Sequence, residues 1–356
     1  MQIHQFHPTV TFGDAVSNQI LSLQAMARQM GHQSEIFCQQ LPVNFGGKVR
    51  QIQHYHAYSS PDTILLLHFS LGYPPDVLSW LTALPDKKVI LYHNITPHSY
   101  FAGINAVFYD AAQDGRAQFP QLRPLTDIGW ADSSFNGQEL MENGWDTVSV
   151  LPIVFDKKRY QKRGDKKVLK QFQNGVNLLF VGRVAPNKHF EDLLLTFYYF
   201  KKYCQPQARL LLVGSAHGME PYTAYLDALI AKLNLTDVHF VGHVSQAQLI
   251  AYYQCATVFL SMSEHEGFGV PLLESMFFEV PVVAYKSSAV PETLGGSGLM
   301  VTQKDFRAIA ELIGLVVEDN ALQQQIVVQQ KVRLPYFEPD QVQAQFAQYV
   351  QAIAEA

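Results

Sequence analysis

The richest cluster of chemically capable residues lies in residues 263–274, which read SEHEGFGVPLLE. Pro271 suits the first turn of a helix, where its missing N–H costs no hydrogen bond. Gly267 and Gly269 precede it, and residues without a Cβ let the backbone turn tightly and approach a ligand. The segment therefore predicts a loop that runs into a helix N-terminus, which is a favourable place for an anion.

We expect the amides of Val270, Leu272 and Leu273 to point out of this helix end toward such an anion. Two carboxylates flank the same turn, Glu266 in the loop and Glu274 in the helix, eight positions apart. Carboxylates near a phosphate cradle make chemical sense when they accept hydrogen bonds from hydroxyls, such as those of a ribose or a sugar ring. On spacing alone, the alternative is an ordinary loop-to-helix junction with two surface acids.

A second segment, residues 181–189 (VGRVAPNKH), follows a predicted strand and precedes a helix. Arg183 and Lys188 lie there near the carboxyl end of the strand, which is where open α/β sheets bind ligands. Arg offers a planar fork to phosphate oxygens, and Lys offers a compact charge. Pairs of loop cations are common. Together with the glycine-rich helix start, however, these two favour a diphosphate bound between the segments.

The first half of the chain has fewer candidates. Gly13, in TVTFGDAVSNQ, opens the first predicted helix and lets the chain come close to a ligand. His93 follows the run KVILY and is the polar residue best suited to face a site from a strand tip, with a structural histidine as the alternative. His54 and His56 are too sparse a pattern for a metal site, so no metal is expected.

Elements that would position these residues follow from the hydrophobic pattern. Short apolar runs alternate with segments of helical period, which predicts parallel sheets with helices on both faces. A helix is expected over 14–30, and others near 190–202, 222–233, 246–254 and 271–278. Strands are expected at 62–69, 88–93, 126–131, 177–181, 209–213, 238–241, 257–260 and 280–284. The pattern predicts two Rossmann-like domains in succession.

The boundary is expected between residues 152 and 177, a stretch with eight Lys or Arg residues and little apolar periodicity. A charge run of this kind is usually a solvated face. The alternative is a patch held near an anionic membrane surface, which would make residues 157–170 a weak peripheral membrane contact.

Composition excludes several classes of protein. The chain has 356 residues, with 26 Lys and Arg against 31 Asp and Glu, a formal net charge of −5. That balance argues against a general polyanion binder, so no nucleic-acid partner is expected. The three cysteines stand far apart, and neither a basic leader with an apolar run nor a bilayer-length apolar stretch is present. We expect a cytoplasmic protein, with the inner face of the membrane as the alternative location.

In this order, the segments VGRVAPNK, LLLVG, FVGHVS, LSMSEHEGFGVPLLESM and PVVAYKSSAVPETLGG resemble the nucleotide-binding half of retaining glycosyltransferases of family 4. The specific element is the R-x4-K pair at Arg183 and Lys188 joined to the E-x7-E pair at Glu266 and Glu274. A local departure is the run Phe-Phe-Glu at residues 277–279, where relatives usually have small residues and a glycine.

The resemblance implies an α/β GT-B fold, two Rossmann-like domains whose parallel sheets face each other across a cleft. Residues 1–165 would form the acceptor-side domain and 170–335 the domain that binds the nucleotide sugar. A helix over 338–356 would pack back on the first domain.

The resemblance also implies roles. Arg183 and Lys188 would neutralise the donor diphosphate as it leaves, Glu266 would hold hydroxyls of the transferred sugar, and His93 would face the same site. The remaining positions would contact the donor: Gly13, Gly214, Val244, Gly267, Phe268, Gly269, Val270, Leu272 and, at the ribose, Glu274.

The function implied is transfer of a hexose from a nucleotide-diphosphate sugar, with UDP-glucose as the expected donor. The acceptor would be a glycan or lipid-linked glycan in polysaccharide biosynthesis. No cofactor is expected, because the sequence has no D-x-D motif and cationic side chains can replace a divalent ion at the diphosphate. The alternatives are a nucleotide-sugar epimerase of the same architecture and a non-catalytic donor-binding subunit.

Overall fold

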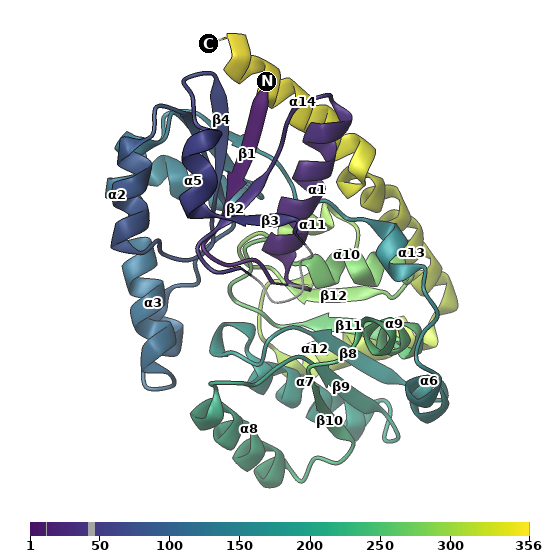
Figure 1. Ribbon diagram of the computed structural model, residues 1–356. Helices are drawn as coiled ribbons and strands as arrows, with labels where there is room; N and C mark the ends of the chain where they lie inside the picture. The colour runs from purple at the N-terminus through teal and green to yellow at the C-terminus, as the bar shows by residue number, and fades with distance from the viewer. Residues whose placement is uncertain (12, 42–46, 356) are drawn as a thin grey trace. The chain divides into compact units, whose positions relative to one another are not determined.

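The structure is a computed structural model that describes residues 1–11, 13–41 and 47–355. The chain divides into two compact units (Figure 1). Unit 1 comprises Met1–His98, Val107–Phe155 and Phe337–Ala356, and unit 2 comprises Ser99–Ala106 and Asp156–Tyr336. The main part of unit 2 thus begins at Asp156, inside the stretch 152–177 where the boundary is expected, and the unit also takes in Ser99–Ala106 from the first half.

Unit 1 is built on a seven-stranded sheet in the order β3-β2-β1-β4-β5-β6-β7, with every neighbouring pair parallel. Its strands are β1 (Gln2–Phe6), β2 (Ile36–Cys38), β3 (Val49–Gln51), β4 (Thr63–Phe69), β5 (Lys87–Tyr92), β6 (Ile128–Ala131) and β7 (Val148–Val150). All seven residues of the central strand β4 are buried, which explains its unbroken apolar run.

Helices of unit 1 are α1 (Ala15–Gln29), α2 (Pro75–Ala83), α3 (Ala106–Arg116), α4 (Phe119–Leu122), α5 (Ser134–Glu142) and α14 (Pro339–Glu355). The apolar stripe of α14, Val342, Phe346, Val350 and Ile353, is buried in the same core cluster as β1, β4, β5 and β6. The Phe346 ring meets Trp130 edge to face at 6.0 Å. The C-terminal helix therefore completes the core of unit 1.

Unit 2 has a six-stranded parallel sheet in the order β10-β9-β8-β11-β12-β13. Its strands are β8 (Asn177–Val181), β9 (Arg209–Val213), β10 (Val238–Gly242), β11 (Val258–Ser261), β12 (Val282–Tyr285) and β13 (Leu299–Val301). Its helices are α6 (Lys166–Phe172), α7 (Phe190–Tyr203), α8 (Glu220–Leu233), α9 (Gln246–Cys255), α10 (Val270–Phe277), α11 (Val290–Leu294), α12 (Phe306–Glu318) and α13 (Asn320–Arg333). The two predicted Rossmann-like α/β domains are confirmed.

Local side chains explain where the key helices begin. Asp14 precedes α1 and accepts the amide of Ser17 at 2.8 Å, so the helix starts one residue later than the pattern predicts. Ser245 precedes α9 and forms a reciprocal capping box with Gln248. In a parallel sheet the loops that follow the strands all lie at one edge, so the two candidate loops of unit 2, which follow β8 and β11, lie at its carboxyl edge.

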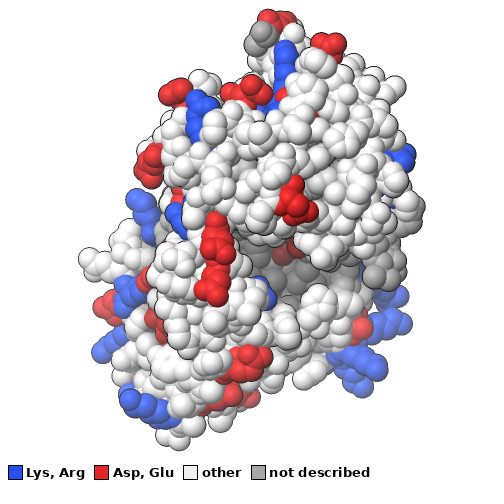
Figure 2. All heavy atoms as spheres, turned by 60° about the vertical axis from the view of Figure 1, so that its left-hand side comes forward, with Lys and Arg blue, Asp and Glu red and all other residues white. Residues whose placement is uncertain are grey.

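Charged side chains of both signs are interspersed over the face drawn in Figure 2, without one broad basic field. This agrees with the small net charge of −5. Among the helices in the described part of the chain, none has an apolar stretch long enough to cross a lipid bilayer.

Candidate active site

Helix α10 begins at the glycine-rich turn, as predicted. Gly269 caps it with φ +93°, a conformation that favours glycine, and a Cβ there would lie 2.9 Å from Leu272 Cδ1, so the end of that side chain would have to shift. The Leu272 amide donates to the Gly269 carbonyl at 2.9 Å. The expectation that this amide points outward to an anion is therefore wrong, because the first turn of the helix already uses it.

Lys188 and Glu266 come together in unit 2 although 78 residues separate them. The Lys188 ammonium lies 2.6 Å from Glu266 Oε2, and the two side chains are 18% and 15% exposed. Lys188 ends the 3₁₀ turn η5 (Pro186–Lys188), and Glu266 lies in the loop between β11 and α10. Glu266 also lines a small hollow with Gly269 and Leu272. The Lys188 ammonium and the Glu266 carboxylate, which can accept hydrogen bonds from hydroxyl groups, thus lie in contact at the carboxyl edge of the sheet.

Asn187, which the sequence did not suggest, holds these two loops together. Its carbonyl accepts the Glu264 amide at 3.0 Å, and its side-chain amide donates to the His265 carbonyl at 3.0 Å. Asn187 is buried, so these bonds are shielded from water. The contact fixes Lys188 against the loop that carries Glu266.

Arg183 follows β8, and its side chain is exposed to solvent. Protein atoms nearby still exclude part of the water around the guanidinium, and this desolvation lowers its pKa. Gly214 follows the neighbouring strand β9, and a Cβ there would lie 1.9 Å from the Gly182 carbonyl oxygen. The Val184 amide donates to the Ser215 carbonyl at 3.0 Å, which ties the two strand ends together. Gly214 therefore lets its own backbone lie close to that of Gly182, the residue before Arg183. The sequence alone did not show this role.

Glu274 is almost fully buried, with 6% of its surface exposed. Each of its carboxylate oxygens accepts a hydrogen bond from a tyrosine hydroxyl, from Tyr160 at 2.6 Å and from Tyr253 at 2.5 Å. Burial raises the pKa of Glu274, and these two hydrogen bonds oppose that rise. The carboxylate that the resemblance assigns to the ribose is thus covered by two phenols.

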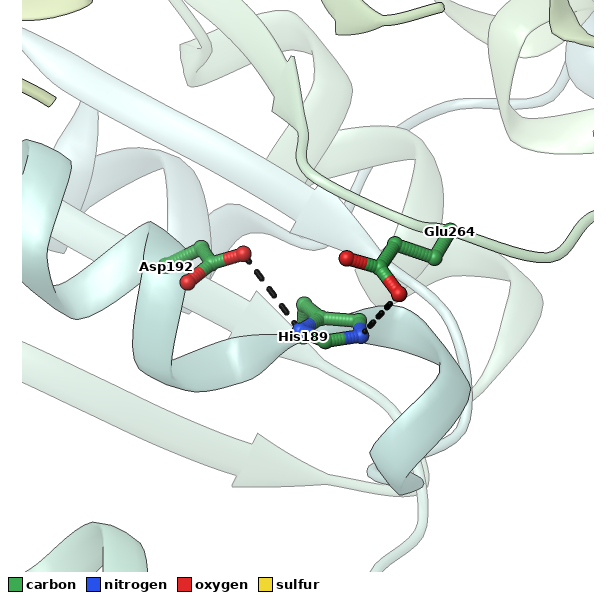
Figure 3. Close-up of side chains that lie close together, drawn as sticks. All are labelled: His189, Asp192 and Glu264. Atoms are coloured by element: carbon green, nitrogen blue, oxygen red, sulfur yellow. Dashed lines mark ion pairs between the residues drawn. The ribbon is translucent and has the colours of Figure 1, made fainter. Parts of the chain in front are cut away.

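An ion network lies directly beside Lys188. Figure 3 shows His189 between Asp192 of α7 and Glu264 of the loop that follows β11. Its Nδ1 lies 3.4 Å from Asp192 Oδ2 and its Nε2 lies 2.9 Å from Glu264 Oε2. Burial disfavours the imidazolium, but hydrogen bonds to Asp192 and Glu191 outweigh it and raise the pKa of His189 to about 9.

His189, Asp192 and Glu264 place possible metal-ligand atoms within 4.8 Å of one another. Lys304, however, lies 2.6 Å from Asp192 and also contacts Glu264. Because Lys304 and the protonated His189 together balance the charges of Asp192 and Glu264, the set fits an internal ion network better than a metal centre. The sequence shows the charges in NKHFED and SEHE, but not that Lys304 joins them.

In unit 1, His93 is held in a buried chain of polar side chains. Its Nδ1 lies 3.2 Å from Asp132 and its Nε2 lies 2.9 Å from His68 Nδ1. The other nitrogen of His68 lies 2.9 Å from the side-chain oxygen of Gln5. The His93 side chain is 1% exposed, so both of its ring nitrogens are committed inside the unit.

The other predicted positions are distributed as follows. Gly13 has φ +93°, and no described residue lies within 4 Å of where its Cβ would be, so among these residues it is the backbone conformation that favours glycine. Phe268 is buried, and its carbonyl accepts the Thr293 hydroxyl at 2.5 Å. Gly267, Val270 and Val244 are half-buried, and Val244 lies just before the capping residue of α9.

Comparison of the fold with solved structures defines the class of protein. HepE from Anabaena, solved in complex with UDP-glucose, aligns with a TM-score of 0.77 at 18% identity, covering 99% of this chain and 100% of HepE. Sucrose-phosphate synthase from Thermosynechococcus elongatus aligns with a TM-score of 0.76 at 19% identity over the full length of both chains. At such identities the likeness shows the fold, and the predicted GT-B class is confirmed.

Residues 161–333 match the family described as glycosyl transferases group 1, which agrees with the resemblance carried by the motifs of this region. The O-antigen chain mannosyltransferase B of Escherichia coli is 28% identical over 148 residues, 40% of this chain and 37% of that protein. The capsular polysaccharide biosynthesis glycosyltransferase CapM of Staphylococcus aureus is 30% identical over 166 residues, 46% and 42% of the two chains. The matched region therefore spans less than half of each relative.

Proposed function

We propose that the chain is a retaining glycosyltransferase that moves a hexose from a nucleotide-diphosphate sugar to a glycan or lipid-linked glycan in polysaccharide biosynthesis. The observation that carries this proposal is the contact of Lys188 with Glu266 at the carboxyl edge of the unit 2 sheet, where the segment after β8 that holds Lys188 also carries Arg183. A cation and a carboxylate at one point suit a ligand that has both a phosphate and hydroxyl groups.

The reaction breaks the bond between the anomeric carbon and the diphosphate oxygen, and the diphosphate leaves with the bonding electrons. The acceptor hydroxyl forms the new bond on the same face of the sugar, and its proton passes to the departing phosphate. Lys188 and Arg183 stabilise the charge that develops on that phosphate. Glu266 orients sugar hydroxyls while its contact with Lys188 keeps the ammonium in place. No protein nucleophile is assigned.

We propose UDP-glucose as the donor, which HepE was solved with. Several curated relatives are mannosyltransferases by name, so the test must include other nucleotides. Melting of the full chain is first measured with UDP, GDP and ADP, because a ligand that binds the native state raises the melting temperature. Release of free nucleotide from a panel of nucleotide sugars, with and without glycan acceptors, then identifies the donor.

Two results would overturn the proposal. Isomerisation of the nucleotide sugar without an acceptor would indicate an epimerase. Binding without turnover on every acceptor tried, in the wild type as in Lys188→Ala, would indicate a donor-binding subunit. Acceptor-dependent release that Lys188→Ala abolishes supports transfer.

We also propose that the activity needs no divalent cation, because Arg183 and Lys188 supply the positive charge at the diphosphate. Turnover measured in excess EDTA should equal turnover in added Mg²⁺ or Mn²⁺. A strict requirement for added metal would contradict this part of the proposal.

We also propose that the basic segment 157–170 makes a weak peripheral contact with anionic lipid. Seven of its eight Lys and Arg side chains are exposed, five of them at Lys162, Arg163, Lys166, Lys167 and Lys170. Each basic residue near an anionic surface adds about 1 kcal/mol of attraction. Cosedimentation with phosphatidylglycerol vesicles at low salt should fall when these five become Gln. Equal binding by this variant would leave the segment as a solvated face.

A further inference from the structure

Glu274 lies at the centre of an aromatic cluster in unit 2. Its two oxygens accept hydrogen bonds from Tyr160 and Tyr253, at 2.6 Å and 2.5 Å. Phe278 stacks on the Tyr253 ring at 5.2 Å with an interplanar angle of 6°, and it meets the Tyr160 ring edge to face at 6.1 Å. Phe277 and Phe278 therefore support the two tyrosines that cover Glu274.

The two tyrosines are held very differently. Tyr253 belongs to α9, is fully buried, and is stacked between Phe278 and Phe259. Tyr160 is the last residue of the short 3₁₀ turn η4 (Lys157–Tyr160) and keeps 7% of its surface exposed. Turning Tyr160 outward breaks its contacts with Phe277 and Phe278 and disturbs one short turn, whereas moving Tyr253 would disrupt a ring that is fully buried in a helix and stacked on two phenylalanines.

Access to Glu274 therefore depends on Tyr160. With 6% of its surface exposed, Glu274 cannot meet a ligand hydroxyl while both phenols are in place. If a ligand hydroxyl replaces the Tyr160 hydroxyl, one O–H···O⁻ bond is lost and one is formed. Such an exchange costs little, whereas a buried carboxylate oxygen left without a donor is expensive.

We propose that Tyr160 is a specificity-determining residue of the ribose subsite, whose phenol occupies the position at Glu274 that a ribose hydroxyl takes when the donor binds. Tyr253 stays in place and holds the second oxygen. This inference rests on the proposed function, because it requires a nucleotide sugar as the donor, with the ribose of that nucleotide at Glu274. A nucleotide that lacks the hydroxyl cannot complete the exchange, so the subsite selects ribose over deoxyribose.

The test is calorimetric titration of the full chain with UDP, GDP and ADP, and with the 2′- and 3′-deoxy forms of the one that binds. Tyr160→Phe removes the competing hydroxyl and keeps the ring, so the ribonucleotide should bind about three- to tenfold more tightly. The affinity lost on deleting the ribose hydroxyl should also be larger in this variant. Tyr253→Phe should bind the ribonucleotide about tenfold more weakly, because one oxygen of Glu274 loses its fixed donor.

Tyr55→Phe is the matched control, because Tyr55 makes a buried tyrosine–carboxylate hydrogen bond with Asp86 in unit 1. Its nucleotide affinity should equal that of the wild type. Weaker or unchanged ribonucleotide binding by Tyr160→Phe would overturn the inference and leave Tyr160 a fixed support of Glu274. Failure of the wild type to bind any of the three nucleotides would instead overturn the proposed function, and the ribose subsite with it.

A second measurement needs no substitution that removes the phenol. With fluorotyrosine at position 160, the ¹⁹F resonance should shift when the nucleotide is added, because the ring leaves Glu274. With the label at position 253, the shift should be much smaller. A position-160 resonance that does not move in the nucleotide-saturated protein would contradict the exchange.

Discussion

The carboxyl edges of the two sheets use histidine in opposite ways. In unit 1, His7, His68 and His93 are buried, and burial lowers the pKa of His7 to about 4 and that of His68 well below its ordinary value. In unit 2, His189 lies among Glu191, Asp192 and Glu264, and its pKa rises to about 9. The same side chain at the same place in the fold is therefore neutral in one unit and cationic in the other.

The difference shows what decides whether a histidine at the carboxyl edge of a sheet is protonated. Burial is the main cause of the lowered pKa of His68, and the neighbouring His93 and His7 lower it further, while its ring nitrogens contact Gln5 and His93 and no carboxylate. Several carboxylates around His189 reverse that cost. The edge of unit 2 thus carries a charged histidine among carboxylates, whereas the edge of unit 1 carries the neutral His7 and His68.

The largest test of this contrast is Lys188→Ala in unit 2. Removing the ammonium leaves the departing phosphate less stabilised, so kcat should fall about 100- to 1000-fold, with a smaller change in donor affinity. Steady-state kinetics with saturating acceptor measures both. Lys201→Ala is the control, because Lys201 pairs with Asp237 on the surface of the same unit at 2.6 Å. A Lys188→Ala enzyme with full kcat would remove the leaving-group role.

Next in size is Asp132→Asn in unit 1. Asp132 is the buried carboxylate that faces His93, and burial raises its pKa against the opposing His93 and Asn136 contacts. Loss of this acceptor should lower the free energy of unfolding by about 2–3 kcal/mol. Urea denaturation measures it. Asp146→Asn is the control, since Asp146 is 92% exposed in its pair with Arg123 and should change stability by less than about 1 kcal/mol.

Acid should weaken unit 1 through its neutral histidines. In the unfolded chain His7 is protonated below its ordinary pKa of 6.5, whereas in the folded protein its pKa is about 4. Asp14 favours protonation of the folded His7, and His93 opposes it. Stability contributed by neutral His7 is therefore lost as the pH falls from about 6.5 to 4, by about 2 kcal/mol. His7→Asn should flatten this slope in urea denaturation at pH 7, 5.5 and 4.5. The exposed His54→Asn should retain the wild-type slope.

The smallest effect, with the opposite sign, is expected at His189. Its folded pKa of about 9 exceeds the ordinary 6.5, so its contribution is complete below pH 6.5 and is lost as the pH rises through 9. His189→Asn keeps a residue that tolerates the observed φ of +50°. It should be about 1 kcal/mol less stable than the wild type at pH 6 and equal to it near pH 10. A difference that does not depend on pH would contradict the cationic state of His189.

Two Rossmann-like units and the glycine-rich start of α10 followed from the sequence, because strand and helix periodicity and turn chemistry act between near neighbours in the chain. Lys188 and Glu266, which lie in the two segments that carry the motifs, form an ion pair in the structure. Local pattern did not show that the Leu272 amide closes the first turn of its own helix.

Contacts between distant residues were decided by the tertiary structure alone. Tyr160 reaches Glu274 across 114 residues, and Lys304 reaches Asp192 across 112. The sheet order and the burial of whole helices bring such pairs together, and neither is encoded in the spacing of a motif. Whether a carboxylate is open to solvent or covered by phenols, and whether a histidine is neutral or charged, depends on those distant neighbours.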